Sequence, residues 1–270
     1  MTTEYDAFAK TYDARSGTFE ADLDFYIGLA REAEPPVLEL ATGTGRVSLP
    51  IARAGVPIVG VDSSVKMLAV ARAKLEKEPD LPLRLVQADM RDFDLPDKGA
   101  FGLAIIPFRS FLHLTTTKDQ IACLSRIHEH LCEGGLLALS FFMPDLETIV
   151  AYQGKLGRVV SCRYSFNSPT SGNEIEVWEY RQYRAHDQFV DQRFVYHEWN
   201  DDGTLLRTTR RGFTLCYIWP REFEHLLARC GFEVRALYGW FDKRPFDENS
   251  AEQVWVAKKG GHLPCQPLKN

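Results

Sequence analysis

The chain has 270 residues, of which 45% are hydrophobic and 26% are charged, as expected for a globular protein built as one large domain with an insertion. Its formal net charge of -5 at pH 7 argues against a general electrostatic attraction to nucleic acid or to anionic lipid. The polar N-terminus, and the lack of any apolar run near the ~18 residues that span a bilayer, predict a cytoplasmic protein that does not bind membranes.

The cysteines occur as single residues among apolar neighbours, and none of them forms a C-x-x-C pair. This pattern predicts reduced, mostly buried thiols rather than disulfides or metal ligands, so we expect no metal site. The cysteines are Cys123, Cys132, Cys162, Cys216, Cys230 and Cys265.

The first half of the chain alternates short apolar runs with helical patterns. Strands are predicted at 37–40, 57–62, 83–89, 101–107 and 136–144. Helices are predicted after the first two runs, at 46–55 and 63–75, and a further helix before the last run is expected to end at Gly134-Gly135. This alternation is typical of βαβ units that form a parallel sheet covered on both faces.

From about residue 158 the sequence becomes rich in β-branched and aromatic residues separated by turn signals, which predicts antiparallel strands. A helix at 220–230 then precedes two strands, at 233–240 and 252–259, that are joined by a loop too short for a helical crossover and so form an antiparallel pair. The predicted organisation is a lid and Rossmann-like core at 1–157, an antiparallel β cap at 158–218, the C-terminal part of the core at 219–260, and a disordered tail at 261–270.

Two glycines follow the first strand, in the stretch ELATGTG at 39–45. Glycine lets a ligand approach the backbone where a Cβ would collide. A dinucleotide fingerprint needs a third glycine three residues later, where this chain has Ser48, and Glu39 would repel a pyrophosphate. The pattern therefore favours a cationic sulfonium cofactor over one that carries phosphate.

The next two strands also end in acids. Asp62 closes the second strand, near the ~20-residue spacing expected for a carboxylate that accepts hydrogen bonds from ribose hydroxyls. Asp89, in Ala88-Asp89-Met90 after the third strand, is suited to accept a hydrogen bond from an adenine amine. Because the carboxyl ends of parallel strands share one edge of the sheet, these acids predict a single adenosine-binding site.

These residues resemble the class I S-adenosylmethionine-dependent methyltransferases. ELATGTG is similar to the E/D-x-G-x-G-x-G signature of the family, with Ala41 in place of the first glycine, and VGVDSS and QADMRDF are similar to its second and third motifs. The resemblance covers nearly all of residues 5–260. It implies an α/β fold with a Rossmann-like seven-stranded methyltransferase sheet whose last strand is antiparallel, here with an inserted antiparallel β cap. It also implies the cofactor S-adenosyl-L-methionine, with S-adenosyl-L-homocysteine as product.

The motifs and the resemblance together predict which residues bind the cofactor. They lie in the N-terminal segment and at the carboxyl ends of the first four strands. The predicted set is Tyr5, Tyr12, Glu39, Ala41, Thr42, Gly43, Thr44, Gly45, Asp62, Ser63, Met67, Ala88, Asp89, Met90, Pro107, Phe108 and Arg109.

The N-terminal stretch YDAFAKTYDA resembles the lid that small-molecule methyltransferases fold over the cofactor. Its rings, Tyr5, Phe8 and Tyr12, would attract a sulfonium, or would simply pack the segment onto the core. The lid tyrosine together with the stretch FRSFLHL is most similar to N-methyltransferases of amino sugars or small amines, which implies catalytic roles for Tyr12 and His113. His113 is a candidate catalytic base, and a structural histidine bonded to the backbone is the alternative.

Arginines and aromatic residues are frequent in the predicted cap, and several interpretations of them stay open. Some could form the walls of an acceptor pocket over the carboxyl edge of the sheet. Most would pack on a two-faced sheet or lie in solvent, and the cap could also form a homodimer interface. The residues are Arg163, Arg181, Arg184, Arg193, Arg207, Arg210, Arg211, Trp178, Tyr180, Tyr183, Tyr196, His197, Tyr217 and Trp219.

The sequence therefore predicts an S-adenosylmethionine-dependent methyltransferase that moves a methyl group to a nitrogen or oxygen atom of a small molecule. A nucleic-acid methyltransferase with the same core would need a basic face and, for amino groups on bases, an N/D-P-P-Y/F-like turn where this chain has Ile106-Pro107-Phe108-Arg109. A nicotinamide oxidoreductase is disfavoured by Ser48 and by the antiparallel ending. A non-catalytic protein that binds the cofactor as a sensor or scaffold is the remaining alternative.

Overall fold

The computed structural model of the chain describes residues 4–7, 9, 11–16, 19–153 and 159–260. The predictions for Phe8 of the lid and for the tail at 261–270 lie outside these residues. No helix within the described ranges is long and apolar enough to cross a membrane. Cys123, Cys132, Cys216 and Cys230 are free thiols.

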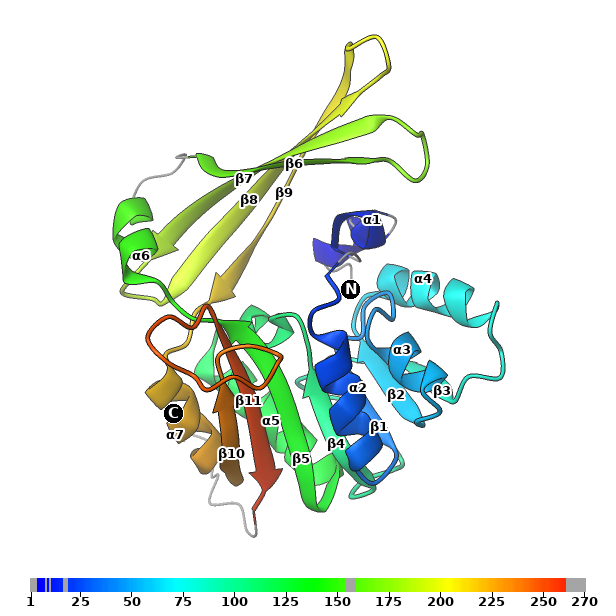
Figure 1. Ribbon diagram of the computed structural model, residues 1–270, viewed down its shortest axis with the longest axis vertical. Helices are drawn as coiled ribbons and strands as arrows, with labels where there is room; N and C mark the ends of the chain where they lie inside the picture. The colour runs from blue at the N-terminus through cyan, green and yellow to red at the C-terminus, as the bar shows by residue number, and fades with distance from the viewer. Residues whose placement is uncertain (1–3, 8, 10, 17–18, 154–158, 261–270) are drawn as a thin grey trace.

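A seven-stranded sheet forms the core of the protein (Figure 1). Its strands, in spatial order, are β10 (Phe232–Tyr238), β11 (Glu252–Lys259), β5 (Leu131–Phe142), β4 (Phe101–Ile106), β1 (Val37–Leu40), β2 (Ile58–Asp62) and β3 (Leu83–Gln87). Neighbouring strands are parallel except for β11, which runs antiparallel to both β10 and β5. The predicted α/β sheet with an antiparallel last strand is confirmed.

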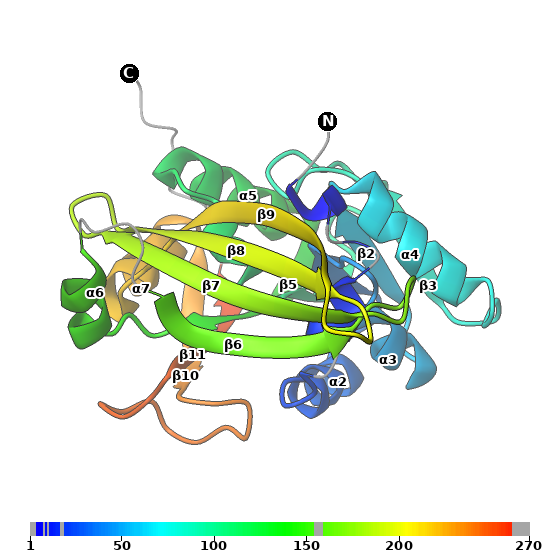
Figure 2. The same ribbon diagram turned by 90° about the horizontal axis from the view of Figure 1, so that it is seen from above.

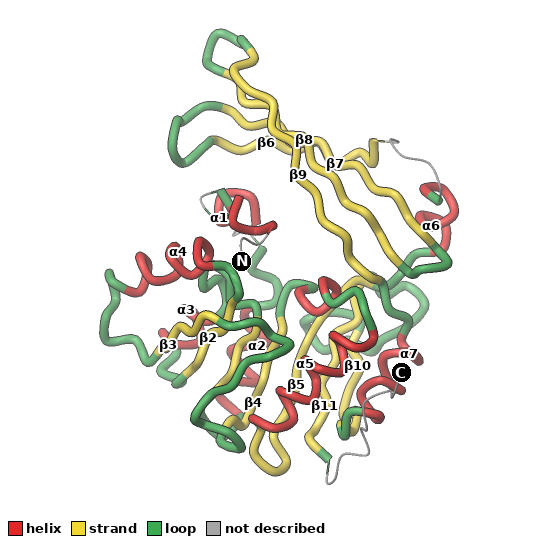
Figure 3. The backbone as a smooth tube through the Cα atoms, turned by 180° about the vertical axis from the view of Figure 1, so that it is seen from behind, coloured by secondary structure: helices red, strands yellow, loops and turns green. Residues whose placement is uncertain are grey.

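Helices cover both faces of this sheet. On one face lie α2 (Leu23–Glu32) and α3 (Ser48–Arg53), and on the other lie α5 (Thr117–His130) and α7 (Pro220–Arg229), as Figures 1 and 3 show from opposite sides. The helix α4 (Val65–Leu75) contacts β2 and β3. Every residue of β1 and β4 is buried, which explains why their sequences are continuous apolar runs. Because β1 to β4 run parallel to one another, their carboxyl ends lie at one edge of the sheet.

The end of α5 differs from the prediction. The helix ends at His130 and not at Gly134-Gly135, because Leu131 is already extended and pairs with Phe101 of β4. The two glycines lie inside β5, where its register against β4 shifts. Gly134 has a φ of +79°, so the pair accommodates an irregular strand rather than a helix end.

A second, four-stranded antiparallel sheet arches over the carboxyl edge of the core sheet (Figures 1 and 2). The helix α6 (Leu146–Tyr152) leads to β6 (Val159–Asn167), β7 (Glu174–Arg184), β8 (Phe189–Trp199) and β9 (Leu205–Cys216). Ile175, Val177 and Phe194 form a small hydrophobic cluster in this sheet. Tyr183 and Val190 pack instead into the main core. The cap is therefore anchored at its base and extends over the edge where β1 to β4 end.

Two short helical segments, η1 (Glu4–Ala7) and α1 (Tyr12–Ser16), lie between the cap and the core (Figure 1). Asp13 accepts a hydrogen bond from Thr44 Oγ1 (2.6 Å) and pairs with Lys74 (2.7 Å). Asp6 accepts a hydrogen bond from Ser64 Oγ (2.5 Å). These contacts fasten the N-terminal segment over the glycine loop and the start of α4.

Candidate active site

The loop that follows β1 presents bare backbone at the carboxyl edge of the sheet. Ala41, Gly43 and Gly45 all have a positive φ, of 57°, 58° and 81°. A Cβ on Gly43 would lie 3.2 Å from Met67 Cε, and one on Gly45 would lie 3.0 Å from Leu49 Cδ1. Gly43 therefore keeps a ligand-facing surface open, whereas Gly45 allows α3 to pack closely behind the loop.

Glu39 lies under this loop. The residue is 2% exposed, and its Oε2 accepts a hydrogen bond from Thr42 Oγ1 (2.9 Å). Because that hydroxyl has only one proton, it accepts the hydrogen bond that joins it to Ser48 Oγ (2.7 Å). Burial raises the pKa of Glu39 to about 7. Glu39 thus braces the glycine loop from beneath, and its predicted contact with the cofactor stays a prediction.

Replacing Glu39 with glutamine tests this bracing role. The pKa of Glu39 is higher in the folded chain (about 7) than its ordinary value of 4.5. The folded state therefore binds more protons between these values, and the free energy of unfolding falls as pH rises through that window. Glutamine keeps an oxygen that accepts the hydrogen bond from Thr42, and it avoids the free-energy cost of a buried ionised carboxylate. We therefore expect Glu39→Gln to raise Tm by a few degrees at pH 8 and much less at pH 5. Differential scanning calorimetry without cofactor measures the difference.

An equal change in Tm at both pH values would contradict the conclusion that burial raises the pKa of Glu39. The affinity for S-adenosylmethionine of the same samples separates two roles of Glu39. If Glu39 contacts the cationic cofactor directly, the neutral glutamine should lower the affinity. If Glu39 only supports the loop through Thr42, the affinity should stay unchanged.

Asp62, at the end of β2, holds its carboxylate in a fixed position. Its Oδ2 accepts a hydrogen bond from the Gly43 amide (2.8 Å) and its Oδ1 from the Ser64 amide (2.7 Å). Ser64 also caps α4, because its hydroxyl accepts a hydrogen bond from the Met67 amide (3.1 Å). Burial raises the pKa of Asp62, although the two amides oppose the shift. A carboxylate has about four acceptor positions, so Asp62 can hold the loop and still accept hydrogen bonds from a diol.

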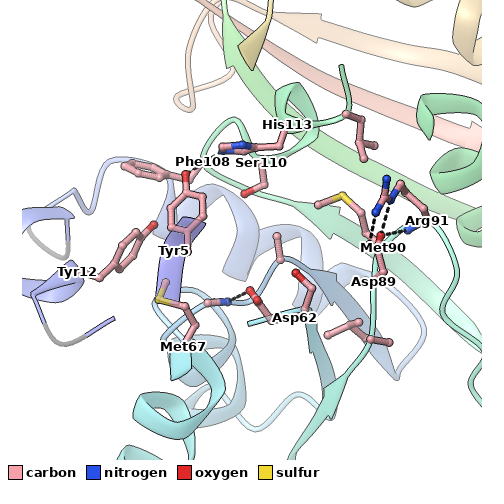
Figure 4. A pocket seen from close by; sticks show the side chains of 16 residues that line it. Tyr5, Tyr12, Asp62, Met67, Asp89, Met90, Arg91, Phe108, Ser110 and His113 are labelled. Atoms are coloured by element: carbon pink, nitrogen blue, oxygen red, sulfur yellow. Dashed lines mark hydrogen bonds and ion pairs between the residues drawn. The ribbon is translucent and has the colours of Figure 1, made fainter. Parts of the chain in front are cut away.

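A cavity of about 410 Å³ opens along the carboxyl ends of β1 to β4 (Figure 4). The predicted site residues that line it are Tyr5, Tyr12, Ala41, Gly43, Asp62, Ser63, Met67, Ala88, Asp89, Met90, Phe108 and His113. The lining residues that the sequence analysis missed are Val61, Arg91, Ser110 and Leu114. The predicted residues that line neither this cavity nor the second one, described below, are Glu39, Thr42, Thr44, Gly45 and Pro107.

Arg91 is the missed residue with the largest effect on the charge of this cavity. Its Nε and Nη2 donate to the two oxygens of Asp89 (2.9 and 2.6 Å; Figure 4). This pairing lowers the pKa of Asp89, so the carboxylate is ionised at neutral pH. Arg91 lies in a turn in which the Asp92 amide donates to the Asp89 carbonyl (3.0 Å) and the Arg91 amide donates to Asp89 Oδ1 (2.9 Å). The available signal was a basic residue two positions after an acid at a strand end.

A second cavity, of about 370 Å³, lies between the cap sheet and the core. Its residues from the core include Phe19, Arg109, Ser140, Phe241 and Glu252. Those from the cap are Tyr164, Glu179, Arg181, Gln192, Phe194, Phe213 and Leu215. Four residues line both cavities and are called the junction here: Tyr5, Tyr12, Phe108 and His113. All four are among the site residues predicted from the sequence, where they belong to a single site.

At the junction, the N-terminal segment meets the cap. Tyr5 Oη and His113 Nε2 form a hydrogen bond (2.8 Å). The Tyr5 ring stacks on Phe213 with 5.9 Å between ring centroids and meets Tyr12 edge-on at 6.3 Å. Burial lowers the pKa of His113 to about 4, so its imidazole is neutral at pH 7. The junction is therefore an aromatic enclosure with one phenol–imidazole hydrogen bond.

Comparisons with known proteins match this arrangement. The methyltransferase domain family matches residues 37–135. A glycine/sarcosine N-methyltransferase from Parasynechococcus marenigrum (strain WH8102) is 36% identical over 246 residues, which cover 89% of this chain and 77% of the relative. The chain belongs to the class I S-adenosylmethionine-dependent methyltransferases.

Solved structures share the fold of the methyltransferase over nearly all of its length. The CcbJ methyltransferase from Streptomyces caelestis has a TM-score of 0.76 at 24% identity, and the match covers 96% of this chain and 99% of that one. CalS10, an amino pentose methyltransferase from Micromonospora echinaspora with its cofactor bound, has a TM-score of 0.67 at 22% identity, over 96% of this chain and 98% of that one. At these identities the likeness concerns the fold.

The larger cavity of the methyltransferase fits its cofactor, S-adenosylmethionine. Its volume is that of a small-molecule site, and the Gly43 backbone and the Asp62 carboxylate face it together. We expect Asp62 to accept from the ribose hydroxyls and Asp89 from the adenine amine. The Asp62 carboxylate, and the rings of Tyr5 and Tyr12 at the other end, suit a ligand with a positive charge, whereas the charge of Asp89 is offset by Arg91.

The loop after β4 holds Phe108 at the junction in a strained backbone. Phe108 and Arg109 have φ values of 56° and 66°, a conformation that residues with a Cβ rarely adopt and that concentrates at functional sites. The Arg109 amide donates to the Ser140 carbonyl (3.1 Å), and its guanidinium pairs with buried Glu252. The Arg46 guanidinium lies 4.8 Å from the centre of the Phe108 ring. The methyltransferase therefore fixes this ring on the boundary between the two cavities.

Proposed function

We propose that this methyltransferase transfers a methyl group to a nitrogen atom of a small molecule held under the cap. The observation that supports the proposal is the junction, since one cavity fits the cofactor and the other meets it at Tyr5, Tyr12, Phe108 and His113. A second cavity of about 370 Å³ suits a small molecule. The name of the glycine/sarcosine N-methyltransferase favours nitrogen over oxygen as the acceptor atom.

The cofactor supplies an electrophilic methyl group for in-line displacement. The residues of this chain contribute binding, alignment and exclusion of water. An acceptor amine attacks only in its uncharged form, so an ammonium acceptor must first release a proton to solvent. With a pKa of about 4, His113 holds a proton poorly at pH 7. We therefore propose that the Tyr5–His113 pair orients the attacking nitrogen and that Tyr12 encloses it from the lid side.

A methyl-transfer assay on the purified full chain tests the proposed function. S-adenosylhomocysteine release is measured with a panel in which each amine is matched by the alcohol or phenol of the same carbon skeleton. We expect turnover with amines, and mass spectrometry should find the added methyl group on nitrogen. A preparation of the Asp62→Ala variant controls for contaminating enzymes. Turnover confined to the oxygen acceptors or to nucleic acid, or cofactor binding without any turnover, would contradict the proposal.

Replacing His113 with glutamine should lower kcat by roughly 10- to 100-fold and leave cofactor affinity nearly unchanged, since His113 lies at the junction. Burial holds the pKa of His113 near 4. The pH profile of kcat/KM for the unsubstituted protein should therefore show no step near pH 6.5 that the substitution removes. Such a step, or an unaffected kcat, would rule out the neutral orienting imidazole. The profile is measured with the best amine of the panel.

A further inference from the structure

One place on the core-facing side of the cap sheet carries charge where apolar residues are expected. Along β7, Ile175, Val177 and Tyr183 are buried on the same face, as the two-residue period of a strand requires. Glu179 and Arg181 occupy the positions between them on that face and form an ion pair with each other. Burying such a pair costs desolvation free energy. Both side chains line the second cavity, so a ligand bound in that cavity would contact the pair.

The core contributes a matching pair to the same cavity. Arg109, from the strained loop after β4, pairs with Glu252 at the start of β11. In each pair the carboxylate is buried and the guanidinium is partly exposed. The side chains of Glu179 and Glu252 are 7% and 6% exposed, whereas those of Arg181 and Arg109 are 29% and 47% exposed. All four side chains line the cavity, and the two guanidinium groups are more exposed than the two carboxylates.

The rest of the cavity wall is largely aromatic. Phe194 and Phe213 come from the cap, with 5.6 Å between their ring centroids. Phe19 and Phe241 come from the core, with 6.0 Å between theirs. Aromatic walls with few polar groups favour a ligand whose body is apolar and whose orientation is set by the polar groups.

We propose that the acceptor is an amine with an apolar body and an anionic group, a carboxylate or a phosphate, that Arg181 and Arg109 bind from the cap and the core. The inference rests on the proposed function, because it describes the acceptor of the same reaction. A guanidinium presents paired donors that match both anions. The buried acids hold the two guanidinium groups in position and keep the empty chamber electrically balanced.

The charge of the chamber also fits the chemistry of an amine. An acceptor that carried only an ammonium group would be repelled by the sulfonium and by a guanidinium group that it approached, because the guanidinium is the more exposed member of each ion pair. An anionic group at the far end offsets this repulsion and turns the molecule so that its nitrogen points away from the arginines. The sulfonium next to the nitrogen favours the uncharged form of the amine, which is the form that attacks.

Ligand-observed NMR on the full chain saturated with S-adenosylhomocysteine tests the inference. The probes share one body: 3-phenylpropanoate, 3-phenylpropyl phosphate, 3-phenylpropylamine and 3-phenylpropanol. Molecules of this size bind with Kd values on the order of millimolar, which the method detects. We expect one or both anions to bind at least ~10-fold more tightly than the alcohol and the amine. The stronger anion then distinguishes carboxylate from phosphate as the natural group.

Variants of the cap pair locate the binding. Arg181→Gln should weaken the anions ~10- to 100-fold and leave the alcohol unchanged, whereas Arg181→Lys, which keeps Glu179 paired, should lose only part of the affinity. Arg207→Gln is the matched control, since Arg207 is a surface residue of β9 paired with Glu198. Equal binding of all probes, no binding of either anion, or anion binding unaffected by both Arg181 variants would overturn the inference.

The two proposals fail in different ways. Turnover of amines without any preference for an anionic group removes the present inference and leaves nitrogen methylation intact. Anion binding that depends on Arg181, in a protein that turns over no amine, removes the proposed function and leaves the binding site.

Discussion

Replacing Asp62 with alanine should weaken the binding of S-adenosylmethionine by at least ~100-fold. The carboxylate accepts hydrogen bonds from the Gly43 and Ser64 amides and lines the larger cavity. Its loss therefore removes the expected ribose contacts and frees the glycine loop at the same time. Hydrogen bonds to a charged group contribute roughly 1.5–3 kcal/mol each, so two of them correspond to this factor or more. Isothermal titration calorimetry gives the affinity directly.

The matched control for this substitution is Asp92→Ala. Asp92 is another acid just beyond a strand of the same sheet edge, and it lines neither cavity. We expect its variant to bind the cofactor as the unsubstituted protein does. A folded Asp62→Ala protein with unchanged affinity would refute the ribose role of Asp62 and the location of the adenosine with it.

Removing residues 1–14 should reduce kcat by ~100-fold or more. The deletion takes away Tyr5 and Tyr12, which line both cavities. It also removes Asp13, which fastens the segment to Thr44 and Lys74. Without them water enters the junction and the acceptor loses its alignment, and small losses of alignment alone cost about 100-fold. Single-turnover assays at saturating cofactor separate this effect from weaker binding.

Two single substitutions divide the effect of the lid into its parts. Tyr5→Phe keeps the ring that stacks on Phe213 and loses the hydrogen bond to His113, so we expect an intermediate loss of kcat. Asp13→Asn weakens the pairing with Lys74 and leaves the junction residues in place. Full activity after deletion of the segment would show that it is not a lid.

Much of the fold was predictable because local patterns and tertiary structure agree. The buried strands β1 and β4 are uninterrupted apolar runs, and β7 and β8 coincide with aromatic and β-branched runs bounded by turn signals. The prediction that a helix ends at Gly134-Gly135 was wrong because glycine with a positive φ occurs both at helix ends and at irregular positions in strands. Only the pairing of Leu131 with Phe101 distinguishes the two.

Parts of the candidate site could not be read from the motif. Glu39 belongs to the motif that suggested the cofactor, but the side chain of a residue inside a strand points to one face or the other, and here it points beneath the loop to Thr42. The strand period shows which cap residues share a face and not which face meets the core. Thus Arg181 lines the second cavity while Arg184 pairs with Asp191. The cap aromatics in the cavity, none of them singled out in the sequence, are Tyr164, Phe194 and Phe213.

The reacting end of the cofactor should lie where the two cavities meet. A crystal structure of the full chain with S-adenosylhomocysteine locates that end. We expect adenosine against Gly43 and Asp62, with the sulfur at the junction beside Tyr5 and Phe108 and facing the space under the cap. Product bound away from Gly43 and Asp62, or with its sulfur turned away from the second cavity, would contradict this expectation.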